Sequence, residues 1–258
     1  MKRTLFLIVI LMLVVVNTMS ATSNESYGYG YKKNFEERAP DLGFYAGLIE
    51  KYNGIYLGDE KEKKVYITFD NGYEQGYTES ILDTLKEKQV PATFFLTGHY
   101  VDDVPELVSR MVDDGHIIGN HSDQHLDYTQ TSDEKVKADL KALDDKITSV
   151  TDQQEVNLFR PAKGVFSERT LQLTDELGYT NVFWTVALVD WHQDQNKGWE
   201  NAFEEVVKQV HPGAIILLHA VSEDNAEALG YLIDELRKRG YEFGSLDEAV
   251  WNNVTQHR

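Results

Sequence analysis

The stretch Val65-Tyr66-Ile67-Thr68-Phe69-Asp70-Asn71-Gly72 decides the fold, because an apolar run ends at once in a carboxylate, an amide and a glycine. A short run rich in β-branched and aromatic residues is typical of a buried strand, so the polar residues lie at its carboxyl tip. Further along, polar residues again follow apolar runs: His121 and His125, Arg160, Asp190, and His219. Polar groups collected at strand ends predict one active site.

From residue 65 onward, short apolar runs alternate with amphipathic stretches of helical length, which indicates β/α units and a mainly parallel sheet. About seven units without an evident reversal of chain order favour a closed, distorted (β/α) barrel of parallel strands over an open doubly wound sheet. The expected strands are Val65–Asp70, Ala92–Thr97, His116–Asn120, Asn157–Arg160, Asn181–Val186, Ala214–His219 and Tyr241–Gly244.

Several helix ends can be read from the sequence. Thr131-Ser132-Asp133-Glu134 fits a capping box before a long charged helix, and Ser167 precedes another helix. Gly178 and Gly240 occupy positions expected of C-terminal caps.

The composition limits the class of protein. The 258 residues carry a formal charge of −18, which argues against nucleic acid as a partner because phosphates would be repelled. Cysteine is absent, so stability must come from the core. No stretch after about residue 60 has the composition of a linker between domains. Together with the chain length, this indicates one domain. Nothing indicates a protein partner, and we expect a monomer.

The N-terminus has the pattern of an export signal. Two cations precede the apolar run Leu5–Val16, and small residues follow around Ala21, which fits a signal peptide over residues 1–21. The run is shorter than the roughly 20 apolar residues of a membrane span. We therefore expect cleavage near Ala21 and export, with an uncleaved membrane anchor as the alternative.

The remaining chain divides into three expected parts. Residues 22–64 form an N-terminal tail and lead-in, of which residues 22–35 look like a tether. The barrel then spans residues 65–251, and residues 252–258 form a C-terminal tail.

Two of the polar groups suggest metal chemistry. His121 and His125 are four residues apart, a spacing that brings two imidazoles together on a helix or in a compact loop. The other interpretation is a surface loop that contains histidines, since the glutamate of HExxH proteases is missing. Asp70 and Asn71 offer a base and a metal-binding oxygen, although Asp-Asn-Gly also simply closes turns.

The other polar groups suggest acid and base chemistry. Arg160 can hold a strand-tip carboxylate ionised, and Asp190 can fix that arginine from its far side. Trp191 offers a flat face for a sugar ring, and His219 has the pKa of a proton donor near neutral pH. Taken singly, these residues also fit a surface ion pair, a tryptophan at the core rim and an interior histidine.

Together and in this order, the elements resemble the motifs of polysaccharide deacetylases of the NodB-homology type, carbohydrate esterase family four. The resemblance spans roughly Val65–Trp251, which is most of the expected mature chain. The lead-in Glu50–Gly58 and the phrase Thr68–Glu74 are similar to the spore-cortex de-N-acetylases that make muramic δ-lactam. The matching motifs are Thr68–Gly72, His121–His125, Arg160–Gly164, Val186–Trp191 and Leu217–His219.

The resemblance implies hydrolysis of an N-acetyl group from a glycan, with peptidoglycan strands as the partner. It implies a divalent metal ligated by three side chains, which are Asn71, His121 and His125. It also implies the remaining roles: Asp70 as base, Arg160 fixed by Asp190 to orient that base, His219 as acid, Trp191 at the substrate and the backbone N–H of Lys163 at the oxyanion.

Three positions depart from the family pattern. Most members carry an aspartate where this chain has Asn71, so we expect a weakly held metal of open identity. At the position of Ala187, relatives commonly have an aspartate that binds the catalytic histidine. We therefore expect His219 to be held less strongly as the acid, and the pH optimum to be lower. Lys163 replaces an aromatic residue, and it can select the lactyl carboxylate of N-acetylmuramic acid or be a plain surface lysine.

Other functions stay open at this point. The barrel can be a peptidoglycan-binding pseudoenzyme, or a deacetylase of N-acetylglucosamine or chitin-like glycans. A glycosidase that uses Asp70 and Asp190 as its carboxylate pair leaves the histidines and Arg160 without a role.

Overall fold

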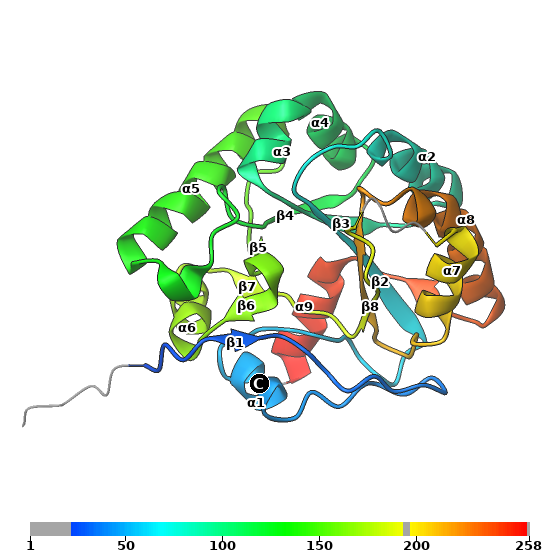
Figure 1. Cartoon of the computed structure of the whole chain (residues 1–258), viewed down its shortest axis with the longest axis horizontal. Helices are drawn as coiled ribbons and strands as arrows, with labels where there is room; N and C mark the ends of the chain where they lie inside the picture. Colours follow the sequence, from blue (N-terminus) through cyan, green and yellow to red (C-terminus); the bar gives the residue numbers. More distant parts are fainter. Residues whose placement is uncertain (1–21, 193–196, 257–258) are drawn as a thin grey trace, which may run out of the picture.

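A parallel sheet curls into an incomplete barrel at the centre of the computed structural model, which describes residues 22–192 and 197–256 (Figure 1). The spatial order of the strands is β7-β5-β4-β3-β2-β9-β8, and β10 pairs with the start of β2. This confirms the predicted distorted barrel. The strands are β2 (Lys64–Asn71), β3 (Ala92–Leu96), β4 (Ile117–Asn120), β5 (Leu158–Phe159), β7 (Thr180–Asn181), β8 (Val186–Ala187), β9 (Ile215–His219) and β10 (Glu242–Phe243).

The barrel is open between its two edge strands. Within the described residues, no ladder joins β7 to β8. Four residues link the two strands, and Ile55 forms a bridge with Val182 beside the gap. The predicted single strand Asn181–Val186 is therefore wrong, because the chain bends between two short strands that pair with different neighbours, β5 and β9.

Helices cover the outside of the sheet, as Figure 1 shows for α2 to α5, α7 and α8. The cluster between sheet and helices includes Val65, Ile67 and Phe69, the alternate residues of β2. The helices are α1 (Phe44–Lys51), α2 (Thr78–Lys88), α3 (Gly98–Asp103), α4 (Pro105–Asp113), α5 (Asp133–Val150), α6 (Glu168–Glu176), α7 (Trp199–Val207), α8 (Glu223–Lys238) and α9 (Leu246–Gln256).

A second cluster fills the barrel interior. Tyr66, on the opposite face of β2, packs there with Phe95, Ile215 and Leu246 of α9. Because side chains alternate along a strand, Thr68 and Asp70 share the inward direction of Tyr66. The apolar interior thus gives way to polar groups toward the carboxyl end of β2.

The predicted helix ends are largely confirmed. Ser167 caps α6 in a capping box with Thr170, and Gly178 and Gly240 follow α6 and α8 with φ of 92° and 84°. The cap of α5 differs from the prediction: Ser132 accepts from the backbone of Lys135, so the box does not run from Thr131 to Glu134.

Both predicted tails need correction. Residues 22–31 are not a loose tether, because β1 (Tyr27–Gly28) pairs antiparallel with β6 (Val165–Phe166). Residues 252–256 belong to α9. The predicted signal peptide, residues 1–21, lies outside the described residues, and none of the helices that the structure describes has the length and apolar character to cross a bilayer.

Candidate active site

The strand tips surround one cavity of about 460 Å³. Asp70 and His219 are register partners on the adjacent strands β2 and β9, while Arg160 and His121 follow β5 and β4. The predicted single site is therefore present, with Asn71, Arg160 and Asp190 behind the cavity wall. Its lining comprises Asp70, Gly72, Tyr73, His121, His125, Lys163, Gly164, Trp184, Trp191, Leu217, His219 and Val221.

Asp70 forms a buried ion pair with Arg160. The guanidinium donates to Asp70 Oδ1 at 2.7 Å and to Thr68 Oγ1 at 2.9 Å, and it lies 4.1 Å from the ring centre of Phe95. Burial raises the pKa of Asp70, but Arg160, His121 and His219 outweigh it, so the net pKa lies below its ordinary value. Asp70 is thus ionised and able to accept a proton.

Asp190 does not bind Arg160, contrary to the prediction. Arg160 is fixed instead by Thr68, by Phe95 and by the Val182 carbonyl, which accepts from Nε at 3.2 Å. The carboxylate of Asp190 follows a different strand, β8, and turns toward β9. The sequence placed both residues at strand tips but could not show which tips are neighbours.

Asp190 binds His219 at both ends of its carboxylate. His219 Nδ1 lies 2.7 Å from Oδ1, and the His219 backbone N–H donates to Oδ2 at 2.9 Å. Asn225 donates to the same Oδ2. Burial lowers the pKa of His219, but Asp190 more than offsets it, so the net pKa is raised. The expectation that Ala187 leaves this histidine without a carboxylate partner is wrong.

His121 and His125 face each other in a loop after β4, with ring centres 5.0 Å apart. His121 Nδ1 donates to the Arg160 carbonyl at 2.8 Å, which leaves Nε2 as the free acceptor, 3.6 Å from Asp70 Oδ2. Burial lowers the pKa of both imidazoles, that of His125 to about 4. They are therefore neutral, as metal ligation requires.

Asp139 of α5 organises this loop, and the sequence analysis missed it. Its buried carboxylate accepts from Ser122 Oγ at 2.8 Å and from the backbone of Asp123 and Gln124 at 2.9 and 3.2 Å. It also accepts from Tyr128 Oη at 2.7 Å. A carboxylate on the apolar face of an amphipathic helix was the available signal, because a buried charge needs several donors.

Asn71 is the remaining candidate ligand. Its side chain is fully buried, yet neither amide atom makes a hydrogen bond of ordinary geometry, and the neighbouring Tyr100 hydroxyl bonds to Glu74 and Thr78. A buried amide without a partner is unfavourable, so the unpaired Asn71 oxygen is available as a ligand for a divalent metal.

That metal set includes an amide. In the part of the chain that the structure describes, no three His, Cys, Asp or Glu side chains form a metal-binding group. The fit therefore depends on Asn71 as the third ligand.

Lys163 and Trp191 lie at the cavity as predicted. Lys163 has φ of 58° in the turn η2 (Ala162–Gly164), and its side chain is exposed and close enough to lower the pKa of His125. The Trp191 side chain is 47% exposed, and its ring centre lies 5.5 Å from that of His219. An exposed ring beside His219 at the cavity is suited to contact a sugar.

Comparisons with known proteins identify sequences similar to this chain. A family model described as polysaccharide deacetylase matches residues 57–182. Peptidoglycan-N-acetylmuramic acid deacetylase PdaA of Bacillus subtilis (strain 168) is 48% identical over 232 residues, 90% of this chain and 88% of that protein. Peptidoglycan-N-acetylglucosamine deacetylase of Bacillus cereus is 38% identical over 196 residues, 73% of this chain and 89% of that protein.

Solved structures of family 4 carbohydrate esterases also match this chain. The structure of Bacillus subtilis PdaA, a family 4 carbohydrate esterase, matches with a TM-score of 0.87 and 48% identity, covering 89% of this chain and 98% of that chain. A family 4 carbohydrate esterase from Bacillus anthracis matches with a TM-score of 0.77 and 49% identity, covering 90% of this chain and all of that one, 100%.

Replacing Asp190 with asparagine tests the carboxylate–imidazole pair. Asp190→Asn keeps the acceptor for His219 Nδ1 but removes the charge that favours the imidazolium, so the pKa of His219 should fall below that of the wild type. NMR titration measures it, with the resonance assigned by its loss in His219→Gln. A His219 pKa equal to that of the wild type would contradict the assigned pairing.

Proposed function

Since the chain belongs to the polysaccharide deacetylase family, we propose that it hydrolyses the N-acetyl group of N-acetylmuramic acid residues in peptidoglycan. The observation that carries the proposal is the pair of oppositely tuned groups at one cavity. Arg160 favours the ionised form of Asp70, and Asp190 favours the protonated form of His219. Groups whose pKa values are driven apart in this way are suited to act as base and acid.

The proposed reaction assigns a proton transfer to one member of each pair. Asp70 takes a proton as a water oxygen bonds to the acetyl carbon, and His219 gives a proton to the departing amine as the carbon–nitrogen bond breaks. The products are acetate and a free amino group. When bound by Asn71, His121 and His125, a divalent metal supplies Lewis acidity at the amide carbonyl. The backbone N–H of Lys163 donates to the developing oxyanion.

The buried charges favour catalysis over binding alone. Transferring charged groups from water into the protein is unfavourable, and a lectin-like pseudoenzyme has no need of a buried base with its own arginine. The glycosidase alternative is disfavoured for a different reason. The Asp190 side chain is 2% exposed and lies behind His219, so it cannot flank a glycosidic bond opposite Asp70.

The muramic acid preference is supported by one cation and one relative. Lys163 places an ammonium at the cavity of a chain with net charge −18, where it can attract the lactyl carboxylate that distinguishes muramic acid from glucosamine. PdaA, the relative at 48% identity, is named as a peptidoglycan-N-acetylmuramic acid deacetylase.

The proposal extends to a role in making the muramic δ-lactam of spore cortex, after export directed by residues 1–21.

Acetate release tests the proposed reaction directly. Purified protein with a divalent metal should release acetate from peptidoglycan, and mass spectrometry should find the loss of acetyl on muramic acid. Asp70→Asn, which removes the base, should lower the rate by about 100-fold or more. Asp145→Asn, on an exposed part of α5, is the control and should leave the rate unchanged. Acetyl loss only from glucosamine would refute the proposed muramic acid substrate, and no acetyl loss at all would refute the proposed deacetylase activity.

The metal site is proposed to hold its ion weakly because Asn71 contributes no charge. Asn71→Asp should tighten binding of zinc or cobalt by about tenfold, since an anionic ligand offsets part of the cation's charge. Isothermal calorimetry measures the affinity without substrate, and His125→Ala, which removes a ligand, should abolish binding. Affinity unchanged or lower in Asn71→Asp would overturn the assignment.

Substrate selection by Lys163 has its own test. Lys163→Ala should lower kcat/KM on muropeptides by about tenfold, because one ion pair with the lactyl carboxylate is lost, while activity on chitooligomers changes little. Lys163→Arg keeps the charge and serves as the matched control. Equal losses on both substrates would show that the lysine does not select muramic acid.

A further inference from the structure

We propose that Tyr29 is a positioning residue of the active site, carried by an amino-terminal strap that comprises residues 22–33. The inference rests on the proposed function, since its effect is measured on the deacetylation rate. The sequence Tyr27-Gly28-Tyr29-Gly30-Tyr31 has an aromatic residue at every second position. In an extended chain this period places all three rings on one face.

The strap is held by an aromatic cluster. Tyr27 and Tyr29 pack against a buried group that includes Phe166 and Phe183, and the backbone of β1 pairs with β6. The ring centres of Tyr29 and Phe183 lie 4.6 Å apart. Such contacts favour one fixed position of the strap on the barrel edge.

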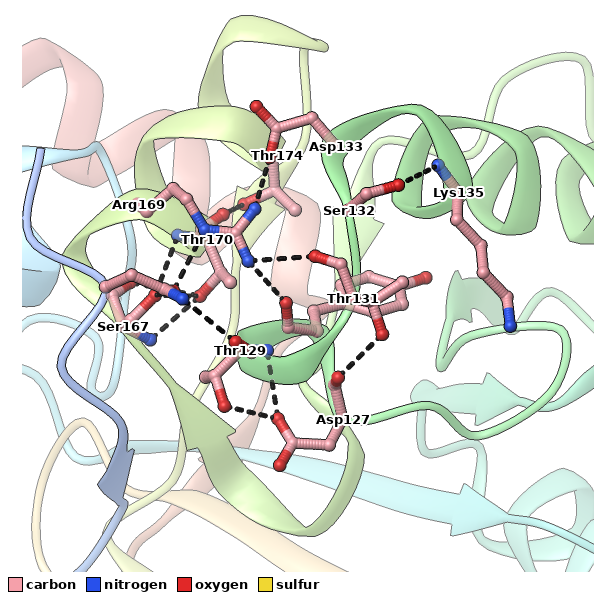
Figure 2. Close-up of polar contacts among 12 residues, drawn as sticks. Asp127, Thr129, Thr131, Ser132, Asp133, Lys135, Ser167, Arg169, Thr170 and Thr174 are labelled. Atoms are coloured by element: carbon pink, nitrogen blue, oxygen red, sulfur yellow. Dashed lines mark hydrogen bonds and ion pairs between the residues drawn. The ribbon is translucent and has the colours of Figure 1, made fainter. Parts of the chain in front are cut away.

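A polar anchor fixes the start of the strap. The Asn24 carboxamide accepts from Ser167 Oγ at 2.8 Å and from Arg169 Nε at 2.9 Å, and it donates to the Thr129 carbonyl at 2.9 Å. Figure 2 shows Arg169 at the centre of this group, where its guanidinium also donates to the Thr131 carbonyl. The anchor holds the strap to the start of α6 and to the turn before α5.

At its other end the strap contacts the wall of the active-site cavity. The Tyr29 backbone N–H donates to the Gly164 carbonyl at 2.8 Å, and its hydroxyl donates to the Trp184 carbonyl at 2.6 Å. The Tyr29 and Trp184 ring centres lie 4.9 Å apart. Gly164 and Trp184 both line the cavity. Tyr29 thus joins two parts of the wall that are 20 residues apart in sequence.

Gly164 shows how closely this wall is packed. A Cβ added to Gly164 would lie 2.9 Å from the Trp184 ring and 3.2 Å from Tyr29 Cβ, and its φ of 64° is in the left-handed region. The turn is therefore confined between the two aromatic residues. We therefore expect a displacement of Tyr29 to shift the backbone beside Lys163.

Two groups of the proposed mechanism lie one contact beyond Tyr29. Lys163, whose backbone N–H is assigned to the oxyanion, precedes Gly164, and the Arg160 guanidinium lies 5.6 Å from the ring centre of Trp184. Catalytic rates fall steeply when donors and orienting groups shift by a fraction of an ångström. Tyr29 touches no reacting atom, so its contribution is to the position of these groups.

The neighbouring Tyr27 provides a matched control. It belongs to the same strap, but its hydroxyl donates to the exposed Glu25 and away from the cavity wall. Tyr27→Phe and Tyr29→Phe each delete one hydroxyl and keep the ring. Only the second deletion removes a contact with the cavity wall.

The test compares these two variants with the wild type in the full chain. Tyr29→Phe should lower kcat by about 5- to 10-fold, with KM changed by less than about twofold. The reason is that the oxyanion donor it positions, the backbone N–H of Lys163, acts mainly on the transition state. Tyr27→Phe should match the wild type in both constants. Tyr29→Ala, which also removes the ring, should lower kcat further, with the folded fraction measured by circular dichroism at the assay temperature.

The outcomes separate the two proposals. If the wild type deacetylates peptidoglycan and Tyr29→Phe has the kcat of Tyr27→Phe, the positioning role is wrong and the proposed function stands. A loss of kcat that only matches the unfolded fraction, or a change in KM alone, also overturns the positioning role. If the wild type releases no acetate, the proposed function itself fails.

Discussion

The buried ion pair between Arg160 and Asp70 is the constraint on which the rest of the site depends. Arg160 is 0% exposed, and a buried guanidinium is unfavourable unless its charge and its donors are matched. Asp70 and Thr68 near the end of β2 match the guanidinium of Arg160, which follows β5. The ends of these two strands must therefore lie close together. The same residue also places His121 through its backbone carbonyl, so base and candidate metal ligand share one support. A buried ion pair is weak evidence that the protein gains stability from it. What this pair does is fix the relative positions of the residues at the ends of β2 and β5.

The second buried pair complements the first. Asp190 contacts both the ring and the backbone of His219, so it fixes the imidazole's orientation as well as its charge. His219 sits beside Asp70 in the register of β9 and β2. Two adjacent strand tips thus carry groups of opposite protonation preference, each tuned by a partner behind the wall. This arrangement lets one cavity hold a base and an acid at the same pH.

The sequence predicted what depends on local pattern and missed what depends on pairing between distant segments. Apolar runs ending in polar residues located the strand tips, because burial and strand geometry leave a direct trace in residue order. The partner of Asp190 left no such trace, since the loop after β8 and the end of β9 meet only in the folded barrel. The strap was mistaken for a tether because glycine, serine and asparagine are typical of loose chain, while its alternating tyrosines indicate a strand. Asp139 was missed for the related reason that its four donors come from a loop before its own helix.

Charge balance explains why the amide at position 71 matters for the metal. Asp70 is matched by Arg160, and Asp190 pairs with His219, whose pKa is raised, while His121, His125 and Asn71 are neutral. A divalent cation would therefore add two charges that no ligand offsets, and Lys163 adds a further positive charge nearby. Like charges repel more strongly in a partly buried site than in water, so this imbalance would weaken binding of the metal. A substrate that carries its own carboxylate, as muramic acid does, would reduce the imbalance, so a neutral ligand set would link metal affinity to the charge of the glycan.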